Sequence, residues 1–188
     1  MRVVAALALA LAAAAAQAQF DPLSILGRAV TTAMDVRTKD EVVTDTEISA
    51  GASKRLLDDK KAEWAGVTLL IFQQHAVLAG AVKTDEVKKR VEELVRSDKR
   101  IRSLKNELHV GDVGSFARDF ALEAEINATL TATKGVGSVN MRWSSVGGHV
   151  VLMGVAQSKE ESDLAAAKVR GIKGVKSLKL HLRVVPKK

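Results

Sequence analysis

One feature constrains the fold of this chain more than any other: its second half repeats its first. When the sequence is shifted by 74 residues, positions 45–110 align with positions 119–184 without a gap. About a quarter of the aligned residues are identical, and among the clearest matches are His75–Gly80 with His149–Gly154 and Ser103–Leu104 with Ser177–Leu178. Two copies of one unit of roughly 66 residues are each near the lower size limit for an independent core. We therefore expect the copies to pack on each other or on the N-terminal segment.

The apolar spacing predicts the order α-β-β-α-β in each copy. Residues four apart form a helical stripe first, at Ile48, Ala52 and Leu56 and again at Leu122, Ile126 and Leu130. Alternating apolar residues then predict a strand, a tight connection and a second strand. Gly147-Gly148 is a good hairpin signal. The equivalent Gln73-Gln74 is a weaker signal, so the hairpin of the first copy is expected to differ locally.

A second helix and a third strand complete each copy. Val87, Val91, Leu94 and Val95 have helical spacing, with Thr84 as the N-cap, and Ser158 and Glu161 form the equivalent start in the second copy. Leu178, Leu180 and Leu182 alternate with Lys179, His181 and Arg183, which predicts a strand with one buried and one cationic face. The fold class is therefore α+β, with two repeated α-β-β-α-β units. Each has a three-stranded mixed sheet with two helices on one face and a parallel crossover.

The N-terminus has the pattern of an export signal. Arg2 precedes an apolar run from Val3 to Ala16, and Ala16-Gln17-Ala18 fits a small-x-small cleavage site. The run is shorter than the roughly 20 residues that cross a bilayer. We predict a signal peptide at 1–18 and a partly helical segment at 19–44. The first domain follows at 45–110, a linker at 111–115 and the second domain at 116–188. The predicted location is the periplasm.

Composition narrows the possible partners. The chain has a formal net charge of +7, 3% aromatic residues and no cysteine. The absence of cysteine excludes disulfides, thiolate nucleophiles and acylation on cysteine. The basic charge favours anionic partners, and export argues against nucleic acid.

These features together resemble a known family. The export signal, the two α-β-β-α-β copies and the hairpin Gly148-His149-Val150-Val151-Leu152-Met153-Gly154 are similar to tandem BON-domain envelope proteins. The resemblance covers about residues 40–185. It implies a non-enzymatic protein that binds phospholipid or another envelope surface and supports outer-membrane integrity or osmotic and envelope stress tolerance. Lipid-anchored members carry a cysteine that this chain lacks, so the resemblance implies at most a peripheral association with the outer membrane.

The first helix of the second copy is the candidate lipid site. Phe116 and Phe120 are four residues apart, and Phe120 is about 160° around the helix from Leu122, away from the core stripe. The first copy has Val42 and Thr46 at these positions. One interpretation is an aromatic wedge that enters lipid headgroups with the help of Arg118. The other is packing of the pair on the first copy or on the N-terminal helix. Asn127, Lys173 and Lys176 complete the predicted lipid-contacting set.

The cations near the C-terminus also have two interpretations. No acidic residue follows Asp163, whereas eight basic ones do: Lys168, Arg170, Lys173, Lys176, Lys179, Arg183, Lys187 and Lys188. They form either an electrostatic surface for anionic lipid or a solvated face that keeps the protein soluble.

The sequence predicts no enzyme, cofactor or metal site. Ser144-Ser145 lacks the context of a nucleophile elbow, and Gly135-Val136-Gly137 precedes a strand instead of opening a helix. His75, His109, His149 and His181 are predicted to be surface residues, because they fall in separate copies or on outer strand faces. The alternative function is a protein-interaction or chaperone-like adaptor that engages envelope proteins.

Overall fold

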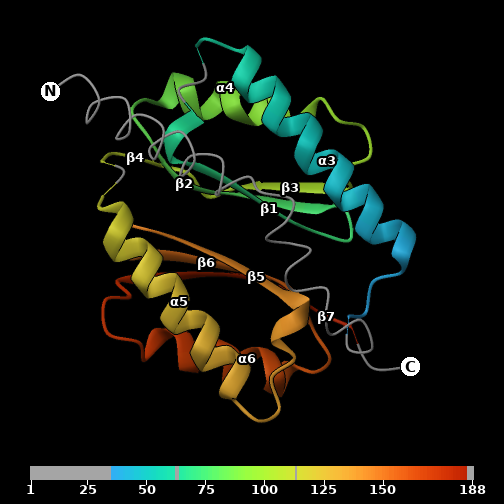
Figure 1. Ribbon diagram of the computed structural model, residues 1–188, viewed down its shortest axis with the longest axis vertical. Coiled ribbons are helices and arrows are strands. Elements are labelled where there is room, and N and C mark those ends of the chain that lie inside the picture. The colour runs from blue at the N-terminus through green and yellow to red at the C-terminus, as the bar shows by residue number, and fades with distance from the viewer. Residues whose placement is uncertain (1–34, 62–63, 113, 186–188) are drawn as a thin grey trace, which may run out of the picture.

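The computed structural model describes residues 35–61, 64–112 and 114–185. The predicted signal peptide and residues 19–34 lie outside this range. The described residues form two α+β units (Figure 1). The first contains α3 (Lys39–Asp58), β1 (Val67–Phe72), β2 (His75–Val82), α4 (Asp85–Arg96), β3 (Ser103–Asn106) and β4 (His109–Val110). The second contains α5 (Phe116–Ala132), β5 (Met141–Val146), β6 (His149–Ala156), α6 (Lys159–Arg170) and β7 (Ser177–Val184). The predicted α+β class and element order are confirmed, although α3 begins six residues before the aligned segment.

Both sheets are mixed, as predicted. β1 pairs antiparallel with β2, and β5 pairs antiparallel with β6. The crossover through α4 or α6 then adds a parallel partner to β2 or β6. In the second unit this partner is β7, which pairs with β6 over eight residues. In the first unit it is divided into the short strands β3 and β4, both parallel to β2.

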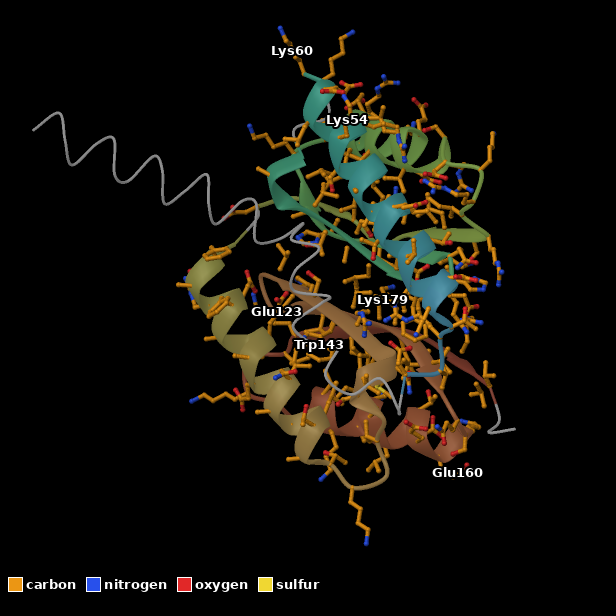
Figure 2. All side chains as sticks on the ribbon, turned by 45° about the vertical axis from the view of Figure 1, so that its right-hand side comes forward. Lys54, Lys60, Glu123, Trp143, Glu160 and Lys179 are labelled. Atoms are coloured by element: carbon orange, nitrogen blue, oxygen red, sulfur yellow. The ribbon has the colours of Figure 1, made fainter. Side chains whose placement is uncertain are left out.

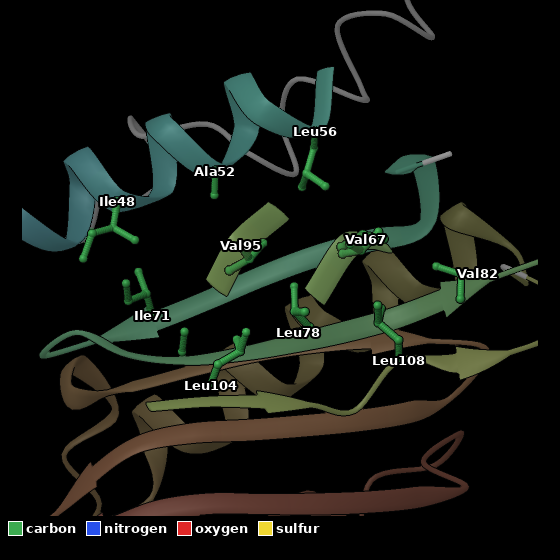
Figure 3. Close-up of a cluster of buried hydrophobic side chains, with 12 residues drawn as sticks. Ile48, Ala52, Leu56, Val67, Ile71, Leu78, Val82, Val95, Leu104 and Leu108 are labelled. Carbon is green, nitrogen blue, oxygen red and sulfur yellow. The ribbon is translucent and has the colours of Figure 1, made fainter. Parts of the chain in front are cut away.

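The two helices of each unit cover one face of its sheet. In the first unit, the α3 stripe is fully buried against β1 and β2 together with Val91 and Val95 of α4. Figure 3 shows Ile48, Ala52 and Leu56 directed from α3 onto Ile71, Leu78 and Val67. Leu122, Ile126 and Leu130 have the same role in the second unit, where Trp143 is 8% exposed. The helical stripes predicted from four-residue spacing are confirmed.

The other faces of the two sheets pack on each other. The seam contains seven buried apolar residues, which are Leu70, Phe72, Val77 and Ala79 of the first unit and Val151, Met153 and Val155 of the second. The layers are therefore helices, sheet, sheet and helices (Figure 1). Each unit is too small to leave such a face in water, and burial of each large apolar side chain contributes about 1.5–3 kcal/mol. The two copies therefore pack on each other, which was one of the two arrangements expected from the sequence.

The cationic face of β7 also turns toward this seam. His181 Nε2 lies 2.8 Å from Glu107 Oε1, and Arg183 donates to Gln73 Oε1 over 2.6 Å. Lys179 lies 3.9 Å from Glu107 Oε2, and Figure 2 shows it beside the boundary between the two units. The prediction that this strand face forms part of an outer cationic surface is therefore wrong for His181 and Arg183. The sequence pattern could not show that a second sheet would face it.

The two copies are related by an approximate twofold axis. Glu107 and His181 occupy equivalent positions of the repeat, 74 residues apart, and they bond to each other. A residue that contacts its own equivalent lies on the axis of an isologous interface. The duplicated chain therefore has the internal symmetry of a homodimer.

A buried aspartate holds each hairpin to the first helix of its unit. Asp45 accepts from the amides of Gln73 and Gln74, each over 2.8 Å. Asp119 accepts from the amides of Gly147 and Gly148 over 2.9 and 3.2 Å. Both hairpins use two left-handed residues, with φ of 54° and 61° at the glutamines. The glutamine hairpin thus has the same backbone as the glycine hairpin.

The residues before α3 connect the two units. The amide of Val36 donates to Oδ1 of Asn140 over 2.9 Å, which reaches the second unit. The Arg37 side chain, 4% exposed, donates to Asp45 and lies 4.5 Å over the Phe72 ring in the first unit. This segment therefore fixes the relative placement of the units together with the seam.

Candidate functional site

The first turns of α5 expose two aromatic side chains. Phe116 and Phe120 are 53% and 65% exposed, and their rings stack with centroids 6.2 Å apart. Phe120 is the most exposed large apolar side chain of the described residues. The expectation that the pair lies off the core stripe of α5 is confirmed. The exposure of both rings argues against the alternative that the pair packs on the first unit, whereas the alternative that it packs on the N-terminal helix concerns residues outside the described range.

The outward face of α5 carries no charge along its length. At 100° per residue, the side opposite Leu122, Ile126 and Leu130 presents exposed alanines, one amide and one hydroxyl. These residues are Ala117, Ala121, Ala124, Asn127, Ala128 and Thr131. By contrast, α4 exposes many charged residues, as its sequence DEVKKRVEELVR requires. The site therefore extends from the phenylalanine pair along a neutral helical face.

Two loops lie beside the N-terminal half of α5. The carboxylate of Asp119 accepts hydrogen bonds from the hairpin amides of Gly147 and Gly148. The carbonyl of Gly148 in turn accepts from the amide of Lys176, which lies in the loop after α6, over 2.8 Å. A β-carbon placed on Gly174 would lie 4.0 Å from Leu122 Cδ1. The loop after α6 is therefore packed against the hairpin and α5.

The predicted residues are thereby brought largely to one end of the second unit. Phe116, Arg118 and Phe120 lie at the start of α5, and the exposed Lys173 and Lys176 lie on the adjacent loop. Asn127 is about two turns further along the same face. Of the other predicted cations, Lys168 and Arg170 are exposed in the last turn of α6. Lys187 and Lys188 lie outside the described residues.

A serine and a histidine are bonded in both copies. His75 Nδ1 lies 2.6 Å from Ser103 Oγ, and His149 Nδ1 lies 2.8 Å from Ser177 Oγ. Each pair joins directly opposed residues of two parallel strands. A hydrolytic pair would use a base oriented by a third group, and no carboxylate bonds either ring within the described part of the chain. The repeated pairs are best explained as register contacts between strands.

His75 makes the stability of the fold depend on pH. Burial lowers the pKa of His75, and the nearby Arg183 and Arg102 lower it further. The unfolded chain therefore binds a proton more readily than the fold does, so stability decreases as pH falls below about 6.5. We expect the urea midpoint to fall between pH 7.5 and 5.5, and His75→Gln to reduce this decrease. Urea unfolding followed by circular dichroism at both pH values measures the midpoints. An equal decrease of the midpoint in His75→Gln and in the unmodified protein would contradict the role of His75.

The seam brings together two histidines that the sequence analysis placed apart. The rings of His109 in β4 and His149 in β6 have centroids 5.2 Å apart. They line a pocket of about 160 Å³ with Gly80, Glu107, Ser177 and Lys179. No sequence pattern predicts this pair, because it depends on how the two sheets face each other. Across residues 35–185, apart from the three that are not described, no group of three or more potential metal ligands is placed to hold an ion.

The comparison with known families agrees with this geometry. The model of the BON domain family matches residues 44–112 and again residues 118–186. The chain belongs to the BON domain family. No helix among the described residues combines the length and apolar character needed to cross a bilayer.

Two curated proteins are similar to this BON-domain chain over most of its length. It is 27% identical to Osmotically-inducible protein Y of Escherichia coli, over 74% of this chain and 72% of that protein. It is 28% identical to an uncharacterized protein of Anaplasma centrale, over 64% of this chain and 83% of that protein. Among solved structures, the C-terminal domain of CdsD, a type III secretion protein of Chlamydia trachomatis, matches with a TM-score of 0.32 and 15% identity. That match covers 71% of this chain and 63% of the CdsD chain.

Proposed function

We propose that this protein binds anionic phospholipid surfaces in the periplasm, without catalysis, and supports envelope integrity under osmotic or envelope stress. The observation that carries the proposal is the exposed Phe116–Phe120 pair at the start of α5. The relation to Osmotically-inducible protein Y supports the stress role, and the apolar run at the N-terminus supports export.

The site offers apolar area and nearby cations to a membrane interface. The two phenyl rings supply apolar area that can enter the headgroup boundary, and the alanine-rich face of α5 allows the helix to lie close to it. Each phenyl ring removed from water contributes about 1.5–3 kcal/mol. Arg118 is exposed on the same helix and Lys173 and Lys176 on the neighbouring loop, and each cation near an anionic surface adds about 1 kcal/mol.

Vesicle sedimentation tests the proposal. We expect binding to vesicles with anionic lipid, little binding to zwitterionic vesicles and weaker binding at high salt, because screening reduces charge attraction. The double variant Phe116→Ala/Phe120→Ala removes the apolar area, so its partition coefficient should fall more than tenfold. Lys173→Gln/Lys176→Gln should weaken binding less and should reduce the dependence on salt.

Matched variants on the first unit control for general effects. Leu57 is 60% exposed at the end of α3, so Leu57→Ala removes a comparable apolar side chain far from the site. Lys54→Gln/Lys60→Gln removes two exposed cations at the opposite end of the molecule from α5 and α6 (Figure 2). Both controls should retain the binding of the unmodified protein. Unchanged binding of the phenylalanine variant would reject the wedge, and a stoichiometric protein partner without vesicle binding would favour the adaptor function.

A further inference from the structure

We propose that His109 and His149 form a transition-metal site for Zn²⁺ or Cu²⁺ that joins the two units across the seam. One imidazole comes from the last strand of the first unit and the other from the second strand of the second unit. Both line the same pocket. The sequence predicts no metal site because these residues are 40 positions apart in different copies. The packing of the two sheets nevertheless brings their rings together.

The spacing of the two rings fits a shared ion. Their centroids are 5.2 Å apart and their planes are tilted by 55°. With metal–nitrogen bonds of about 2.0–2.1 Å, two imidazoles on one tetrahedral ion have ring centres about 5 Å apart. The pocket of about 160 Å³ beside them leaves room for water to complete the coordination. Gly80 helps to line this pocket and fills none of it with a side chain.

One of the two rings is already oriented. Nδ1 of His149 is bonded to Ser177 Oγ over 2.8 Å, which leaves Nε2 as the nitrogen available to an ion. A metal-binding histidine normally donates its other ring N–H to a neighbouring oxygen in this way. Ser177 is thus a positioning residue for the site.

Glu107 is not needed as a ligand. Its carboxylate lines the pocket but is engaged by His181 at 2.8 Å and Lys179 at 3.9 Å. The site therefore has two protein ligands, in agreement with the absence of larger ligand groups among the described residues. Imidazole pairs of this kind prefer Cu²⁺ over other first-row divalent ions. Because one ligand belongs to each unit, binding should stabilise the two-unit arrangement as a whole.

The repeat supplies a matched control. His75 occupies the position of His149 in the first copy and is bonded to Ser103 in the same manner. The residue equivalent to His109 is Arg183, so the symmetric place across the axis holds a guanidinium instead of an imidazole. A guanidinium stays protonated and cannot ligate a metal. His75→Ala therefore removes a similar histidine without affecting the proposed site.

The test uses the full chain without a histidine tag at pH 7.5, with Zn²⁺ and Cu²⁺ as probes. Calorimetric titration should give one ion per chain, and the unfolding temperature should rise with ion concentration. His109→Ala and His149→Ala should each lower the affinity more than a hundredfold, and Ser177→Ala about tenfold, as loss of an outer partner does. His75→Ala and Ser103→Ala should bind like the unmodified protein.

Two results would overturn the proposal. One is unchanged affinity in His109→Ala or His149→Ala, or an equal loss in His75→Ala, since binding would then be adventitious. The other is a Cu²⁺ electron paramagnetic resonance spectrum of the unmodified protein that lacks coupling to two imidazole nitrogens. The spectrum needs no variant, so the test holds even if a substitution perturbs the fold. It is also independent of vesicle binding.

Discussion

Gly154→Ala is expected to unfold the second unit under conditions in which the unmodified protein is stable. A β-carbon at this position would lie 2.1 Å from the carbonyl oxygen of Asn140, and the backbone has φ of 129°. Strain of about 1–3 kcal/mol from the backbone adds to an overpacking cost of similar size. The free energy of unfolding should fall by about 4 kcal/mol, which is a large fraction of the stability of a small domain.

Urea unfolding followed by circular dichroism and by the fluorescence of buried Trp143 measures this effect. Gly171→Ala is the control, because Gly171 has φ of −76° and its nearest contact would be 3.5 Å away. It should change stability by less than about 0.5 kcal/mol. Gly80 is the equivalent position in the first copy, where a β-carbon would lie 2.0 Å from the carbonyl oxygen of Gly66. Gly80→Ala should therefore be similarly harmful, and normal stability of both variants would refute this account.

The second large effect is expected from the buried aspartates. Asp119→Ala leaves the amides of Gly147 and Gly148 and the hydroxyl of Ser145 without their acceptor. Each unsatisfied buried polar group costs about 1–3 kcal/mol, so the loss for these three groups should be at least about 3 kcal/mol. Asp45→Ala should cost more, because it also removes a partner of the Arg37 guanidinium, which is 4% exposed.

The control for these variants is an aspartate on the surface. Asp163 is 61% exposed and pairs only with the exposed Lys159 on α6 among the described residues. Its replacement by alanine should lower stability by less than about 0.5 kcal/mol. Thermal unfolding of Asp119→Ala, Asp45→Ala and Asp163→Ala in parallel distinguishes the two environments. An equal decrease for all three would mean that the hairpin bonds contribute little.

The fold of each copy could be predicted because its determinants are local. Ile48, Ala52 and Leu56 have the spacing of a buried helical stripe, and strand alternation combined with a helical crossover leads to a mixed sheet. The seam between copies was a weaker prediction. The sequence signal for this seam is the continuous run without polar side chains from Val150 to Ala156 in β6, and all of these residues are buried. Such a run is typical of a sheet that is covered on both sides.

The site was predictable only in part. The position of Phe120 relative to the core stripe follows from helical geometry alone, and its 65% exposure agrees. Asp45 and Asp119 were missed, although they are identical in both copies and lie three residues before the first core residue of each helix. The His109–His149 contact was missed for a different reason. It depends on the orientation of two sheets, which no local spacing encodes.

The layer order places the neutral face of α5 and the strongly charged helix α4 on opposite exteriors of the molecule. The sheets occupy the centre, so the α3–α4 layer and the α5–α6 layer face away from each other (Figure 1). If the proposed binding of α5 to a bilayer holds, the strongly charged helix α4 faces the aqueous compartment. The duplication would then leave one copy free to specialise for the membrane surface, while the other copy stays accessible from solution.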